Sequence, residues 1–395
     1  MFIYISILLL IIFNIYRFDI RKKQNNKLRN FYIIIFILFI VASFRYHIGI
    51  DSVRYELAFE RTAPLFSLNA NNLAWNELSQ PLWFFINSFF RTFSDNFVVI
   101  QLFHSAVFHI LLAKFIIKTC VMPYTALGVI FCVAWWNFSF EILRESLCVV
   151  IYLNSLFYLN EKKYNKYILS TITSMCIHWF SFAIFLITPL INLCKRKWLF
   201  VVLVFVGMLI FAIDSSGIAD IINRFTFILG DSAGDRINAY IESDTYGVVY
   251  LSLLGVIFIF LTQILYPMIV SKYLSKSSTD ILYSKILLLY IIFVILRTKI
   301  LIFDRFSNYL IILLIVYTLN ILSYRFNNHM NVFSRMYLYF GLLYCVFQGI
   351  NSFISPSSLE LRTNITYDCR YIPYKTIFQE PDDIREELYN SYIVY

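Results

Sequence analysis

Apolar residues form long continuous runs along nearly the whole chain, and short polar segments separate these runs. VVLVFVGMLIFAI and ILLLYIIFVIL are two of them. A strand of a membrane barrel alternates apolar and polar residues, and these runs do not. A bilayer core admits only helices or closed barrels, and runs of this length suit helices. The pattern therefore predicts an all-α, polytopic integral membrane protein.

Hydropathy and the positions of basic loops predict about twelve transmembrane helices, with the N- and C-termini outside. The first run lacks a basic n-region and a small-residue cleavage site, so we expect a retained span rather than a signal peptide. The segment QPLWFFINSFFRTF at 80–93 is expected to lie at the outer interface, although a further span there would change the count. The approximate spans are 2–17, 30–44, 97–117, 123–139, 142–160, 166–179, 180–194, 198–213, 247–270, 281–297, 306–324 and 336–352.

Composition supports this class, because 60% of the 395 residues are hydrophobic and only 14% are charged. The densest basic clusters, at 17–29, 161–167 and 195–197, are expected in the cytoplasm. On that path the outer side carries 12 arginines and 2 lysines, and the cytoplasmic side 6 arginines and 13 lysines. Arginine grips phosphate and carboxylate with a planar fork of donors. The excess of arginine on the outer side indicates either that a phosphorylated or acidic ligand binds there or that these arginines form salt bridges with the outer acidic residues.

We expect one helical membrane domain over residues 1–352, followed by an outer-face tail over 353–395. Its outer loops 45–96 and 214–246 are expected to carry part of a site. The seven cysteines show no CxxC motif and no Cys/His ligand spacing, so we expect neither disulfides nor a metal site. No cofactor and no nucleic-acid partner are expected.

The segment FRYHIGIDSVRYELAFE at 44–60 places several ionisable groups where a predicted span ends. Arg45, His47, Asp51 and Arg54 belong to it, and Gly49 allows a tight turn that folds the loop back. A solvated loop is the alternative interpretation.

A second charged patch opens the apolar helix predicted after residue 140. Glu141, Arg144 and Glu145 are three and four residues apart and are expected to share one face of that helix. Acids suit the positive end of a helix dipole, but Arg144 does not. We therefore expect Arg144 to have an anionic partner.

Three further positions stand out. His178 lies between two apolar helices, either as a base or as a hydrogen-bonded structural residue. Arg297, Lys299, Asp304 and Arg305 separate two spans with almost no loop. They predict a polar cavity open to the outside, or a simple neutralisation of one arginine by Asp304. In the tail, tyrosines after Arg370 suit a membrane interface or the stacking of sugar rings.

The order and spacing of these residues resemble the EpsG family of exopolysaccharide polymerases, relatives of the Wzy O-antigen polymerases. The family pattern has an arginine, then Gly-Thr-Asp, then a tyrosine four residues after the aspartate. Arg45, Gly49, Asp51 and Tyr55 match it, with Ile50 in the threonine place.

Later features extend the resemblance from residue 44 to about residue 375. Arg144 matches the arginine that opens an apolar helix, and Glu145 replaces the glutamine that commonly follows. His178 corresponds to a histidine after a lysine-bearing cytoplasmic loop and a short helix. Arg305 and Tyr309 match a late arginine with a tyrosine four residues on.

The resemblance implies an enzyme that joins oligosaccharide repeat units carried on undecaprenyl diphosphate. It implies glycosyl transfer without a metal, at the periplasmic or extracellular side of the bacterial plasma membrane. The product would be exopolysaccharide, capsule or O-antigen, and the resemblance also implies a chain-length regulator protein as a partner.

Glycosyl transfer from a diphosphate requires positive charge at the leaving group and a base for the attacking hydroxyl. Arg45, Arg144 and Arg305 are candidates for the charge. Asp51, Glu145 and His178 are candidates for the base, with a preference for His178 because its ordinary pKa is nearest neutral. The remaining substrate-binding candidates are Arg54, Tyr55, Arg297, Tyr309, Arg370 and Tyr374.

Two other functions fit the same composition. A transporter or flippase for lipid-linked oligosaccharide often carries midplane charges and repeated halves, whereas here the charges lie at one face and no internal repeat is seen. An O-antigen ligase has similar chemistry, but usually carries a larger outer loop between late spans.

Overall fold

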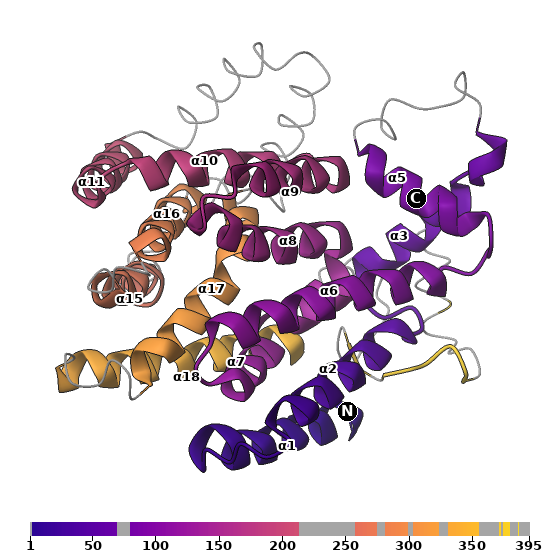
Figure 1. Cartoon of the computed structure of the whole chain (residues 1–395), viewed down its shortest axis with the longest axis horizontal. Helices are drawn as coiled ribbons and strands as arrows, with labels where there is room; N and C mark the ends of the chain where they lie inside the picture. The colour runs from indigo at the N-terminus through magenta and orange to yellow at the C-terminus, as the bar shows by residue number, and fades with distance from the viewer. Residues whose placement is uncertain are drawn as a thin grey trace. The chain divides into compact units, whose positions relative to one another are not determined.

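The computed structural model describes residues 2–68, 80–212, 257–274, 281–298, 303–323, 331–354, 371–372, 374–379 and 386 (Figure 1). Regular structure in these residues is helical, and the one β pairing is an isolated antiparallel bridge between Arg45 and Thr376. The predicted all-α class is therefore confirmed. The chain forms two compact units, Met1–Phe185 with Leu342–Tyr395 and Leu186–Gly341, and each is described by itself.

The first unit begins with two helical hairpins. Helix α2 packs along α6, and α1 packs against α7 (Figure 1). Stacked aromatic rings fill the space between them, with the Phe18 ring 5.0 Å from that of Tyr124. These elements are α1 (Phe2–Asn14), its π-helical continuation η1 (Ile15–Ile20), α2 (Lys27–Ser43), α6 (Val98–Thr119) and α7 (Pro123–Ile130).

Between α2 and α6 the chain forms shorter helices, of which α3 is polar and α5 largely apolar. They are α3 (Ile50–Arg61), the 3₁₀ turn η2 (Leu65–Ser67) and α5 (Pro81–Arg91). Helix α5 has 11 residues, and at a rise of about 1.5 Å per residue it is too short to cross a bilayer. It therefore adds no span, and its place at the outer interface stays a prediction.

Helix α8 is the centre of the first unit. It packs against both α6 and α9 and is buried along most of its length. Two π-helical segments precede it, and α10 follows α9, lying in this unit up to Phe185. These elements are η4 (Phe131–Trp135), η5 (Asn137–Glu141), α8 (Leu143–Asn160), α9 (Tyr164–Ile177) and α10 (Ser181–Leu193).

In the second unit, α16 packs against α11, α15 and α17. The elements are α11 (Arg196–Ala212), η6 (Phe260–Leu265), α15 (Tyr266–Leu274), α16 (Ile281–Arg297), α17 (Asp304–Leu322) and α18 (Val332–Ile354), the last up to Gly341. Helix α16 is apolar around nearly its whole circumference, which is typical of a helix enclosed by other helices.

Among the described residues, four helices are long and apolar enough to cross a membrane: Phe2–Ile20, Val98–Thr119, Ile257–Leu274 and Asp304–Leu322. Two shorter apolar helices are Pro123–Trp135 and Ser181–Leu193. The count of twelve spans, the outward termini and the division into residues 1–352 and 353–395 stay predictions. The predicted loop 214–246 lies outside the described residues.

Candidate functional site

A tight turn joins the end of α2 to α3 and folds the chain back onto η5. Gly49 adopts a φ of +94°, and a Cβ at this position would lie 2.4 Å from the carbonyl oxygen of Phe140. Only glycine accepts both the backbone conformation and this close approach. The tight turn predicted at Gly49 is present, and it brings the first charged patch against the second.

Glu141 connects the two patches. Its side chain is 1% exposed, and its Oε2 accepts a hydrogen bond of 2.9 Å from the backbone N–H of Asp51, in the first turn of α3. A carboxylate is stabilised at a helix N-terminus by the free N–H groups and the helix dipole. Glu141 therefore fixes the start of α3 from the segment that precedes α8.

The expected single helix face with Glu141, Arg144 and Glu145 is wrong. The backbone at Ile142 has φ −90° and ψ 57°, which ends η5 before α8 begins at Leu143. Glu141 therefore belongs to η5 and reaches α3, whereas Arg144 and Glu145 lie in the first turn of α8. Because of this break, charged residues that are close in the sequence interact with different helices.

Arg144 lies between neutral groups contributed by two other helices. Its Nη1 donates a hydrogen bond of 2.7 Å to Oε1 of Gln80, which precedes α5. Its guanidinium carbon is 5.2 Å from the centroid of the Tyr55 ring, which in turn contacts Trp83 edge-to-face. Within the described part of the chain, Arg144 forms no ion pair with a carboxylate. Its positive charge is thus oriented without being neutralised.

Tyr55 is a neutral partner for this arginine near pH 7. Burial raises the pKa of the Tyr55 hydroxyl, and the neighbouring Arg144 only partly opposes the shift. Asp51 and Glu145 raise that pKa further, so both carboxylates lie within electrostatic reach of the same hydroxyl. Helix α3 and the first turn of α8 therefore form one cluster.

The three candidate bases differ in exposure. The Asp51 side chain is 38% exposed, whereas Glu145 and His178 are buried. Arg54 lies 3.5 Å from Asp51 and is 65% exposed, so that ion pair is solvated and weak. Asp51 is therefore the most accessible of the three groups.

His178 ends α9 and lies in a corner that packs on α8. Its ring stacks near that of Phe180, with centroids 6.3 Å apart. Four residues earlier, the carbonyl of Ser174 accepts a hydrogen bond of 3.3 Å from the thiol of Cys148. Cys148 lies one turn after Arg144 on α8, so the corner with His178 is brought to the helix that carries Arg144 and Glu145.

Arg45 and Tyr374 form hydrogen bonds with other residues of the chain. The Arg45 side chain is fully buried and donates to the carbonyl of Ala42 and, over 3.0 Å, to Oγ of Ser52. Burial lowers the pKa of Arg45 to about 10, which leaves it charged near neutral pH. The Tyr374 hydroxyl donates to the carbonyl of Val41 over 2.9 Å, and burial raises the pKa of Tyr374 to about 12. Both residues connect the end of α2 to neighbouring segments.

The second unit contains the late candidates Arg297, Arg305 and Tyr309. Arg297 pairs with Asp304 and donates to Gln263, so Asp304 neutralises one arginine, as one alternative predicted. Arg305 is half-buried and Tyr309 is fully buried on α17. Lys299 and Arg370 lie outside the described residues.

A polar pocket of about 430 Å³ flanks another face of α3. Glu56 and Glu60 line it together with His47, whose Nε2 lies 3.2 Å from Oε2 of Glu56. These residues were visible in the sequence as part of the charged segment. Where residues are described, no three His, Cys, Asp or Glu side chains come together as a metal site.

Sequence reasoning missed the contribution of α5. Gln80 orients Arg144, and Trp83 contacts Tyr55. The sequence predicts an interfacial helix or a further span for this segment, and no local pattern in it indicates a partner 64 residues away in the chain.

The sequence model of the EpsG family matches residues 28–376 of the chain. No curated protein and no solved structure gives a match. The matched range extends from the start of α2 into the tail. It therefore includes every candidate residue from Arg45 to Tyr374.

Proposed function

The chain belongs to the EpsG family, a family of Wzy-like polymerases, and from this membership we propose that it polymerises oligosaccharide repeat units carried on undecaprenyl diphosphate. In the proposed reaction, the growing glycan leaves its lipid diphosphate and bonds to a sugar hydroxyl of the next lipid-linked unit. The reaction takes place at the outer face of the bacterial plasma membrane. The proposed topology has twelve spans with both termini outside.

The arrangement around Arg144 is the observation that supports this proposal most directly. Negative charge builds on the departing diphosphate, and a cation oriented in advance stabilises it. Arg144 is half-buried, oriented by Gln80 and Tyr55, and free of a carboxylate ion pair among the described residues. Its remaining donors suit the oxygens of a diphosphate. Arg305 is proposed as a second cation.

Arg45 and Tyr374 act in this proposal by positioning. Arg45 uses its donors on Ala42 and Ser52, so it holds the start of α3, which carries Asp51 and Tyr55. Tyr374 holds the tail to the end of α2. Arg54, Arg297, Tyr309 and Arg370 complete the proposed substrate-binding set.

The base is proposed to come from Asp51, Glu145 or His178. Exposure favours Asp51, and an ordinary pKa near neutral favours His178. Transfer rates of Asp51→Asn, Glu145→Gln and His178→Ala variants across pH separate the three. Loss of the acid limb of the rate profile in only one variant identifies the base.

We propose that fixed arginines replace a metal ion in this reaction. The test is transfer by the purified protein with an excess of chelator. Full activity supports the proposal, and abolished activity that returns with added metal would contradict it.

Deletion of the gene, with analysis of lipid-linked and surface glycans by gel and mass spectrometry, tests the function itself. We expect the deletion strain to carry single repeat units and no long polymer. The intact gene restores the long polymer, and the Arg144→Ala variant does not. Full units trapped on the cytoplasmic side would instead indicate a flippase. Undiminished polymer on the wrong acceptor would indicate a ligase.

A further inference from the structure

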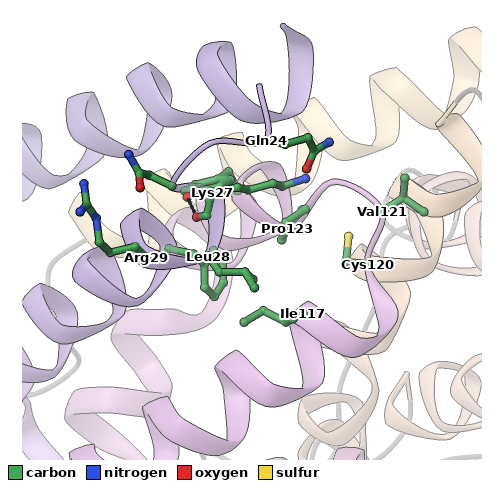
Figure 2. A pocket seen from close by; sticks show the side chains of 11 residues that line it. Gln24, Lys27, Leu28, Arg29, Ile117, Cys120, Val121 and Pro123 are labelled. Carbon is green, nitrogen blue, oxygen red and sulfur yellow. Dashed lines mark hydrogen bonds between the residues drawn. The ribbon is translucent and has the colours of Figure 1, made fainter. Parts of the chain in front are cut away.

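A pocket of about 440 Å³ lies at the opposite end of α2 from Arg45 (Figure 2). The 17 residues of α2 place these two ends about 25 Å apart along the helix axis. The start of α2, the end of α6 and the start of α7 form the pocket, all within the first unit. The site proposed for glycosyl transfer does not use it.

The polar side of the pocket is positively charged. Lys27 extends over it toward Gln24, and Arg29 lies at its edge (Figure 2). Neither base forms an ion pair within the residues that the structure describes. The nearby Asp19 carboxylate accepts hydrogen bonds from the backbone N–H of Thr125, at 2.7 Å, and from its hydroxyl, at 2.9 Å, and it lies within electrostatic reach of Lys27.

The backbone adds to this charge. Helix α2 begins at Lys27, and its N-cap residue Asn26 makes no side-chain capping bond. The first N–H groups of a helix attract anions. The N–H of Lys27 already donates to the carbonyl of Gln24 over 3.2 Å, and the rest of the first turn of α2 borders the cavity beside the two cations. The pocket therefore combines side-chain charge and a helix N-terminus in a half-open cavity.

Aromatic packing fixes the wall of the pocket. The hydroxyl of Tyr124 donates a hydrogen bond to the carbonyl of Lys27. Its ring stacks on Phe18 and meets Phe31 edge-to-face, with centroids 5.0 and 5.4 Å apart. The backbone of Lys27 is thus held by a tyrosine whose ring packs among other aromatic rings.

An exposed apolar stripe leads away from the pocket along α2. Leu28, Tyr32 and Phe36 are 56%, 54% and 61% exposed, and their spacing of four residues puts them on one helix face. Helix α6, which also borders the pocket, is long and apolar enough to cross a membrane. A cationic pocket that continues into an apolar stripe suits an amphipathic anion better than a free one.

We propose that this pocket binds the phosphate headgroup of an anionic glycerophospholipid, whose acyl chains lie along the stripe of Leu28, Tyr32 and Phe36. By the predicted topology, the lipid belongs to the cytoplasmic leaflet. The bound lipid stabilises the junction of α2, α6 and α7. This site is independent of the proposed polymerase function.

Native mass spectrometry of the purified full-length protein tests the site. The probes are phosphatidylglycerol and phosphatidylcholine with the same acyl chains. The wild-type protein is expected to retain phosphatidylglycerol about tenfold better, because its headgroup carries a net negative charge that attracts the two bases, whereas the headgroup of phosphatidylcholine is neutral overall. Replacing both Lys27 and Arg29 by Gln removes this preference. Val121→Trp, which keeps the charges but fills the pocket, also lowers it.

Lys22→Gln with Lys23→Gln is the matched control, because both lysines are exposed, lie just before α2 and do not line the pocket. This variant keeps the preference. An equal loss in the control would overturn the proposal in favour of diffuse charge in the loop. Equal retention of the two lipids by the wild-type protein would also overturn it. Displacement of phosphatidylglycerol by inorganic phosphate alone would do the same, because the pocket would then be a free-anion site.

Discussion

At the scale of single residues, Arg144 combines a fixed orientation with a free charge. A lysine there keeps the charge but loses the planar fork that contacts Gln80 and lies near the Tyr55 ring. We expect Arg144→Lys to lower the transfer rate by about 100-fold at unchanged protein level. The measurement is polymer formation from lipid-linked units by purified protein.

The control is Arg61→Lys, at the exposed end of α3. It is expected to retain activity, because this side chain belongs to no part of the proposed site. Full-length polymer at the normal rate from Arg144→Lys would contradict the role of Arg144.

Gly49 is a second residue for which the structure requires a particular amino acid, because the Phe140 carbonyl leaves no room for a side chain. In a Gly49→Ala variant, the Cβ meets the Phe140 carbonyl and φ stays in the left-handed region. We expect a loss of about 2 kcal/mol in stability, observed as a lower melting temperature in detergent. Gly207→Ala is the control, because a Cβ there has no neighbour within 4 Å. Equal melting temperatures for the two variants would show that the turn tolerates a side chain.

At the scale of elements, Glu141 joins α3 to the segment before α8. Glu141→Ala leaves the N–H of Asp51 without its acceptor, at a cost of roughly 1 to 3 kcal/mol. We expect faster hydrogen exchange at Asp51 and slower transfer. Glu141→Gln retains an acceptor oxygen and is expected to keep most of both properties. Unchanged exchange in Glu141→Ala would mean that other contacts hold α3.

At the scale of the whole molecule, the proposed chemistry depends on which side of the membrane α3 and α5 face. Alkaline phosphatase, which is active only outside the cytoplasm, can report this when it is fused after Asn25 or after Asp95. The fusion at Asn25 is expected to be inactive and the fusion at Asp95 active, because the basic cluster at 17–29 favours the cytoplasm. The opposite result would place the Arg144 cluster inside the cell.

The sequence by itself determined the class of the protein and the residues worth attention. Helical membrane segments follow from the local run of apolar residues, so α6 and α17 were predictable within a few residues. The turn at Gly49 was also predictable, because glycine is a local conformational signal. The candidate residues Arg45, Asp51 and Arg144 were identified by type and spacing.

Only the tertiary structure decided which of these residues meet and which are free. Gln80 reaches Arg144 across 64 residues, and Glu141 reaches Asp51 across 90. The helix break at Ile142 separates Glu141 from Arg144 despite their spacing, and burial turns Arg45 inward. Such contacts depend on how the helices pack against one another. The hydropathy of a residue indicates whether it prefers to be buried, but it does not indicate which residue will be its neighbour.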